Sequence, residues 1–134
     1  RQRQMCIRDS ISAYAGVREK LLMLQRQLGK EHNVVMDGRD IGTNVLKDAQ
    51  LKVYLTAGSD TRARRRFDEL TAKGILCNLE EIKKDIEERD YQDMHRSIAP
   101  LKQAEDAIYL DSSAMTIEEV AEKIQTLMRE KGWK

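Results

Sequence analysis

The sequence has 134 residues, of which 35% are charged and 4% are aromatic, and its formal net charge at pH 7 is +1. This length supports one domain with one modest core, and the small net charge argues against general binding of nucleic acid, because no global positive field would attract a polyanion. No apolar run is long enough to span a bilayer, and the few aromatic residues offer no stacking platform for single strands.

Apolar spacing and turn residues in the first part of the chain predict a helix followed by two strands. We expect the helix over residues 12–28, ended by Gly29. Its apolar stripe consists of Val17, Leu21, Leu24 and Leu28. The apolar run at 34–36, which Asp-Gly follows, predicts a buried strand, and residues 52–56 predict a second strand.

Two helices are expected after the second strand. The first is capped by Ser59 or Asp60 and runs to about Lys73, where Gly74 ends it. The second opens at Asn78 with the spacing of a capping box. It must end before the single proline, because the residue that precedes a proline avoids helical backbone angles.

The end of the chain completes an alternation of strands and helices. Residues 107–111 predict a third strand, and a capping box at Thr116 begins a terminal helix that Gly132 closes. The alternation predicts the α/β class with a parallel sheet. We expect residues 11–134 to belong to one domain. Residues 1–10 fit no element and are expected to be a non-native or disordered leader.

One helical face changes from apolar to charged along its length. Its apolar part consists of Leu79, Ile82 and Ile86. The same count of 3.6 residues per turn places Arg89, Asp93 and Arg96 on that face. Buried charge is unfavourable unless it is paired or binds something, and two guanidinium forks beside a carboxylate suit a phosphate with hydroxyls nearby. The alternative is an internal ion-pair network.

Two more segments that contain arginine are candidates for anion binding. The segment DGRDIGT at 37–43 follows the first predicted strand, and ligands of open α/β sheets bind beyond the carboxyl ends of strands. The alternative there is a turn in which Asp40 caps a helix. At the start of the next helix, Arg62, Arg65 and Arg66 would clamp phosphoryl oxygens, or would form a solvated basic face.

Other types of catalytic site find little support. Neither histidine has an evident acid–base partner, and Cys6 and Cys77 have no metal-ligand spacing. A reduced, cytoplasmic chain without a protein-bound metal is a simpler interpretation than a single disulfide. We expect no partner among nucleic acids or membranes.

The ordered segments VVMDGRDIGT, SDTRARRR, EERDYQDMHRSIAPL and AIYLDSSAMTIEEV resemble the bacterial cytidylate kinases, which are P-loop nucleoside monophosphate kinases. The resemblance covers about residues 11–134. It implies transfer of the terminal phosphoryl group of ATP to CMP or dCMP, with Mg2+, by a cytoplasmic enzyme that we expect to be monomeric.

The resemblance also implies which residues bind the acceptor nucleotide. Arg18 and Asp40 would contact the cytosine, whose amino group suits a carboxylate and whose ring nitrogen and carbonyl suit a guanidinium. Arg39 and Arg96 would hold the acceptor phosphate.

Further roles follow from the same motifs. Arg89 and Asp93 would contact the sugar hydroxyls. Arg62 and Arg65 would act in catalysis as part of a lid that closes over the donor phosphates. Asp37 would lie near the metal.

The sequence departs from the family pattern at its start. The string G-x-x-x-x-G-K-[ST] does not occur, and Asp9 and Gly16 stand where the family has serine and proline. We therefore expect the carboxyl-terminal part of a cytidylate kinase, with a truncated P-loop kinase fold that lacks the first strand and the phosphate loop. Such a chain would be marginally stable and inactive alone. The alternatives are a kinase for another nucleoside monophosphate, a nucleotide-binding module without chemistry, and a fragment without a role.

Overall fold

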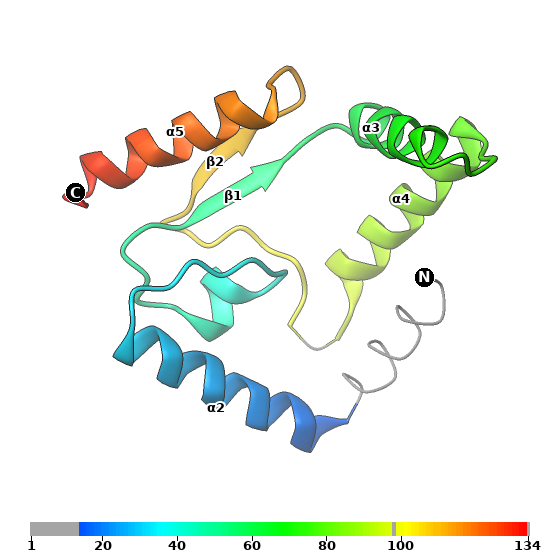
Figure 1. Ribbon diagram of the computed structural model, residues 1–134. Helices are drawn as coiled ribbons and strands as arrows, with labels where there is room; N and C mark the ends of the chain where they lie inside the picture. The colour runs from blue at the N-terminus through cyan, green and yellow to red at the C-terminus, as the bar shows by residue number, and fades with distance from the viewer. Residues whose placement is uncertain (1–13, 98, 134) are drawn as a thin grey trace.

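The computed structural model describes residues 14–97 and 99–133 (Figure 1). The predicted leader at 1–10 lies outside the described residues. In chain order the elements are the helix α2 (Ala15–Glu31), the short π-helix η1 (Ile41–Val45), the strand β1 (Val53–Thr56), the helices α3 (Ser59–Ala72) and α4 (Leu79–His95), the strand β2 (Ile108–Asp111) and the helix α5 (Ile117–Glu130).

The described strands form a small parallel sheet, which confirms a mixed helix and strand architecture with parallel pairing. β1 and β2 pair from Val53 opposite Ile108 to Thr56 opposite Asp111. The backbone N–H and the hydroxyl of Ser112 both donate to the Thr56 carbonyl, at 2.8 and 2.9 Å, and so extend the pairing past the strand ends. In Figure 1, α5 lies along β2, and α3 and α4 lie beyond the carboxyl end of β1.

The predicted strand at 34–36 is not formed. Residues 33–38 have no regular secondary structure, and Val35 is 94% exposed. A strand needs a neighbour whose backbone groups satisfy its own. Within the described part of the chain, the sheet contains β1 and β2 alone, and no strand pairs with residues 34–36. The apolar run therefore stays without a partner.

The end of α2 differs from its prediction. The helix continues past Gly29 to Glu31, and His32 follows in an extended conformation with its N–H bonded to the Leu28 carbonyl at 3.0 Å. Gly29 has another use, because a Cβ atom at this position would lie 2.8 Å from the side chain of Leu46. The glycine permits close packing of Leu46 on α2 rather than ending the helix.

The predicted limits of α3 are confirmed, but its predicted caps are not. Gly58 is the residue that precedes the first helical turn, so neither Ser59 nor Asp60 caps the helix. The Ser59 hydroxyl instead donates to Glu87 of α4 at 3.0 Å. Gly74 follows the helix with a φ of +70°, a conformation that favours glycine.

The predicted starts and ends of α4 and α5 are confirmed. Asn78 caps α4, because its side-chain oxygen accepts from the backbone N–H groups of Glu80 and Glu81, and the helix ends before the proline. Thr116 and Glu119 form the reciprocal capping box of α5. Gly132 follows α5 with a φ of +88°.

The core of the described residues is small, and the apolar stripe of α2 remains about half exposed. The buried hydrophobic residues are Val45, Ala57, Ala63, Leu110 and Leu127. Low stability therefore stays a prediction that agrees with the limited burial. None of the described helices is long and apolar enough to cross a bilayer.

Candidate functional site

The loop before η1 and the last turn of α4 meet through an ion pair. The carboxylate of Asp93 accepts a hydrogen bond from Arg39 Nε at 2.7 Å, and Arg96 Nη1 lies 3.8 Å from its other oxygen. The Asp93 side chain is 18% exposed and that of Arg39 is 47% exposed. The structure thus brings together three of the predicted substrate-binding residues, although 54 positions of sequence separate Arg39 from Asp93.

The backbone after α4 fixes this arrangement. The Asp93 carbonyl accepts from the N–H of Leu101 at 2.8 Å, which folds the chain back onto the helix end. Arg96 follows the last helical residue in an extended conformation, so the prediction that it continues the helical face of Arg89 is wrong. Its Nε donates to the carbonyl of Ala99 at 2.6 Å, and Ala99 has a φ of +52°.

The predicted change of character along α4 is confirmed for the helical residues. Arg89 and Asp93 are half-buried, as are Ile82 and Ile86 of the preceding turns, and His95 is exposed as expected. The alternative of an internal ion-pair network is also realised at Asp93. The same carboxylate that could face a sugar is therefore held between two guanidinium groups.

The segment at 37–43 forms the turn that begins η1. Asp40 occupies the position before the first turn, and its carboxylate accepts from the side-chain amide of Asn44 at 3.1 Å. On the opposite side, Arg26 of α2 donates to the carbonyl of Asn44 at 2.8 Å and to that of Val45 at 3.2 Å. Sequence reasoning missed Arg26, because an arginine on the polar side of a helix carries no local signal of such a contact.

Arg18 and Asp37 are not joined to this cluster. Arg18 lies half-buried near the start of α2, and its side chain forms no hydrogen bond or ion pair with the residues that the structure describes. Asp37 is exposed. Between residues 14 and 133, leaving out residue 98, no group of three or more His, Cys, Asp or Glu side chains is placed to hold a metal ion.

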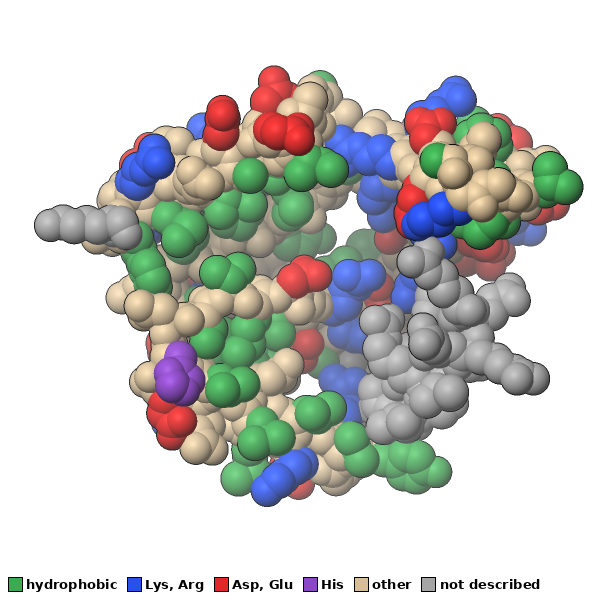
Figure 2. Space-filling model, in the orientation of Figure 1, with side chains coloured by type: hydrophobic (Ala, Val, Ile, Leu, Met, Phe, Trp, Pro, Cys, Tyr) green, Lys and Arg blue, Asp and Glu red, His purple; other side chains and the backbone are tan. Residues whose placement is uncertain are grey.

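Arg62 joins α3 to α4. Its Nη1 and Nη2 donate to the two oxygens of Asp90 at 2.9 and 2.5 Å, and its Nε donates to the Ala57 carbonyl at 2.8 Å. The hydrogen bonds from Arg62 to Asp90 raise the pKa of the guanidinium above its usual value, although partial burial opposes this shift. Figure 2 shows Lys and Arg side chains along the hollow between the α3–α4 pair and the rest of the molecule.

The arginines at the start of α3 diverge instead of forming one cluster. Arg65 donates to the carbonyls of Ser112 and Met115 at 2.7 and 2.9 Å, and therefore ties α3 to the loop between β2 and α5. Arg66 pairs with Glu69 one turn later, at 2.6 Å. Arg62 and Arg66 are thus paired with carboxylates, whereas Arg65 bonds backbone carbonyls. Arg65 is exposed and the Arg66 side chain is 40% exposed, so the alternative of a solvated basic face stays open for these two residues.

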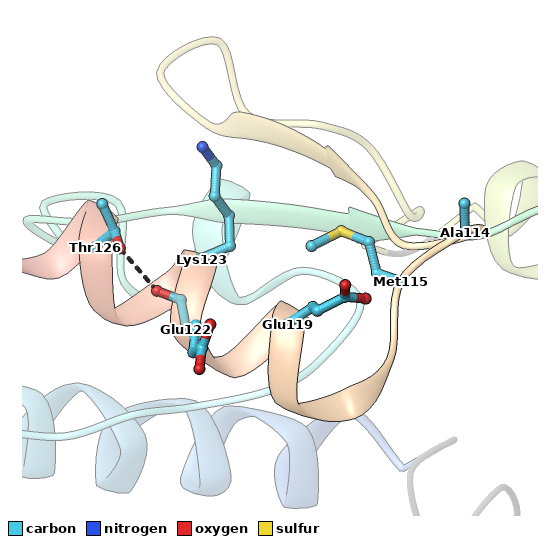
Figure 3. Close-up of a pocket in the computed structure, with 6 residues that line it drawn as sticks. All are labelled: Ala114, Met115, Glu119, Glu122, Lys123 and Thr126. Atoms are coloured by element: carbon cyan, nitrogen blue, oxygen red, sulfur yellow. Dashed lines mark hydrogen bonds between the residues drawn. The ribbon is translucent and has the colours of Figure 1, made fainter.

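A separate hollow of about 380 Å³ lies on one side of α5 (Figure 3). Its lining comes from α5 and the loop before it, and consists of Ala114, Met115, Glu119, Glu122, Lys123 and Thr126. In Figure 3 the side chains of Glu122 and Lys123 point in different directions rather than toward one centre. None of the predicted site residues lines this hollow.

Comparisons with known proteins place these features in a family. The sequence model described as "Cytidylate kinase" matches residues 6–130. Proteins named "Cytidylate kinase" from Streptococcus pneumoniae strains Hungary19A-6, G54 (serotype 19F) and ATCC 700669 / Spain 23F-1 are each 54% identical over 117 residues. These alignments cover 87% of this chain and 52% of each relative, so the chain spans about half the length of the curated relatives it matches. Because the family match extends over most of the sequence, the chain belongs to the cytidylate kinase family.

Proposed function

We propose that this chain supplies the acceptor-nucleotide site of a cytidylate kinase, and that the whole protein transfers the terminal phosphoryl group of ATP to CMP or dCMP. Membership of the family supports the reaction. The observation that carries the assignment to this chain is the cluster of Arg39, Asp93 and Arg96. We also propose a cytoplasmic, monomeric protein, because the family resemblance implies one.

The charges of the cluster fit a nucleoside monophosphate. A phosphate monoester carries about two negative charges at neutral pH and offers oxygens that guanidinium groups bind in a fork. Arg39 and Arg96 would turn from Asp93 to that phosphate, and the Asp93 carboxylate would then accept hydrogen bonds from sugar hydroxyls. Arg89, one turn earlier on α4, would contact the same sugar.

The base would be recognised at the other end of the same site. Asp40 is held near the start of η1 by Asn44, so its position depends on the packing of η1 against α2. A carboxylate there would accept from the cytosine amino group, and Arg18 would donate to the ring nitrogen and carbonyl. Uracil offers no amino donor to Asp40, so this pair would discriminate against UMP.

ATP and Mg2+ belong to the proposal for the whole protein. The sequence has no G-x-x-x-x-G-K-[ST] string, whose backbone N–H groups would cradle the donor phosphates. Among the described residues, no group of three or more His, Cys, Asp or Glu side chains is placed to hold Mg2+. Catalysis in this family consists of positioning and charge neutralisation. We expect the chain alone to bind CMP but to transfer phosphate at no useful rate.

Isothermal titration calorimetry with separate CMP, dCMP, UMP, AMP and ATP tests the proposal. We expect saturable binding of CMP or dCMP, and binding at least about tenfold weaker for UMP and AMP, because a hydrogen bond to a charged group such as Asp40 is worth roughly 1.5–3 kcal/mol. A preference for UMP or AMP would assign the chain to a different acceptor. A folded chain that binds none of these nucleotides would refute the proposal.

A further inference from the structure

The guanidinium of Arg62 has no pair of adjacent N–H groups that is free to bind an anion. Its outer edge is taken by both oxygens of Asp90, and its Nε is taken by the Ala57 carbonyl. The two remaining N–H groups lie on opposite edges of the planar group, one beside Nε and one beside the side-chain stem. A phosphoryl group can therefore gain a two-pronged contact with Arg62 only by displacing Asp90 or the carbonyl.

Asp90 is the partner that is easier to displace. Its side chain is 32% exposed, and that of Arg62 is 36% exposed, so water can replace the carboxylate as it leaves. The Ala57 carbonyl lies on a buried residue at the end of β1, and its loss would leave a buried acceptor unsatisfied. An incoming anion also resembles the carboxylate that it replaces.

The contact between α3 and α4 does not depend on Asp90 alone. Asp60 pairs with Lys83 at 2.7 Å, and Ser59 donates to Glu87 at 3.0 Å. Both ties join the first turn of α3 to the turns of α4 that precede Asp90. Release of Arg62 therefore leaves the two helices connected.

We propose that Asp90 is a positioning residue that competes with polyphosphate for Arg62. The carboxylate holds the guanidinium at the end of β1 until a phosphoryl group takes over its fork. The inference rests on the proposed kinase function in one respect, the contact of Arg62 with donor phosphates that the family resemblance implies, since the pairing itself is a property of this chain.

The test uses inorganic tripolyphosphate and titration calorimetry at fixed ionic strength. We expect Asp90→Asn to bind tripolyphosphate about three- to tenfold more tightly than the unaltered chain, because the anion no longer competes with a carboxylate. The gain should disappear when Arg62→Ala is added to Asp90→Asn, and Asp90→Glu should restore weaker binding. Circular dichroism verifies that every variant keeps its helices.

Glu87→Gln is the matched control. It removes one negative charge from the same face of α4, one turn from Asp90, and alters the acceptor of the Ser59 hydrogen bond while leaving the Arg62 contact in place. We expect less than a twofold change in its tripolyphosphate affinity. An equal gain in Glu87→Gln would show that net charge alone is responsible. Unchanged, weaker or undetectable binding by folded Asp90→Asn, or a gain that persists without Arg62, would overturn the inference.

CMP titrations of the same samples separate this inference from the proposed function. A chain that does not bind CMP but shows the Arg62-dependent gain would retain the competition and lose the proposed acceptor site. A chain that binds CMP without the Arg62-dependent gain would keep the proposed acceptor site and would refute the competition between Asp90 and polyphosphate.

Discussion

Replacement of Asp93 by Asn removes one charge from the centre of the cluster and preserves its shape. In the folded protein the carboxylate is mostly buried, bonds Arg39 at 2.7 Å and faces Arg96 at 3.8 Å. Exposed ion pairs contribute about 0.2–1 kcal/mol, and hydrogen bonds to charged groups contribute roughly 1.5–3 kcal/mol. Arg39 is half exposed while Asp93 is not, so the contribution of their pair should lie between these two ranges. We therefore expect the substitution to lower the unfolding free energy by about 1 kcal/mol.

The same substitution should distinguish contacts with the sugar from contacts with the phosphate. If Asp93 binds sugar hydroxyls, Asp93→Asn should weaken CMP binding about tenfold, which corresponds to roughly 1.4 kcal/mol. Binding of inorganic phosphate should not weaken, because Arg39 and Arg96 both remain and lose a competing carboxylate.

Urea unfolding and calorimetry with CMP and with phosphate measure these effects. The control is Asp85→Asn, since Asp85 is exposed on the same helix and forms no hydrogen bond or ion pair with other described residues. We expect the control to change the unfolding free energy by less than about 0.5 kcal/mol. Equal stability of the two variants, or a parallel loss of CMP and phosphate affinity in Asp93→Asn, would refute the reasoning.

Two further predictions concern α3 and the glycines. The hydrogen bond from Lys73 is the largest influence that lowers the pKa of Glu69, from 4.5 to about 2, so its contribution to stability is present above pH 4.5 and is lost as the pH falls toward 2. Carbon-detected NMR titration should give that low midpoint and an increase in Lys73→Ala, whereas a midpoint near 4.5 in the unaltered chain would contradict the contact. Gly74→Ala should lower the unfolding free energy by about 1 kcal/mol, because Gly74 has a positive φ. Gly16→Ala should raise the unfolding free energy by roughly 0.5–1 kcal/mol, because Gly16 lies in α2 with open space around it. Urea unfolding measures both, and changes of the same sign would contradict the local explanation.

Features that depend on neighbouring residues were predictable from the sequence. The caps at Asn78 and Thr116 are such features, since each side chain bonds a backbone group within three residues. The run at 34–36 failed as a prediction because a strand depends on a distant partner, and apolar composition does not reveal whether one is present. The prediction that Gly29 ends the helix failed for a related reason, since close packing of Leu46 and a helix end both favour glycine.

Some contacts of the candidate site could likewise be predicted from the sequence, and others could not. The proximity of Arg39 to Asp93 followed from motifs that the family resemblance linked, although no local pattern connects them. The pairing of Arg62 with Asp90 and the contacts of Arg26 with η1 could not be predicted, because they arise from how helices pack. The predicted contacts of all these site residues with nucleotide remain predictions.

The parallel sheet has a consequence for the order in which the chain assembles. The bond between Ser112 and Thr56 closes a loop of 56 residues, whereas the bond between Arg62 and Asp90 closes one of 28. Each doubling of loop length adds about 0.6 kcal/mol of closure entropy, and the sheet has only short strands to offset it. The helical pair α3–α4 should therefore form early and shorten the flexible chain between β1 and β2. The strands would then join last, and their amide protons would exchange with solvent before those of α3 and α4.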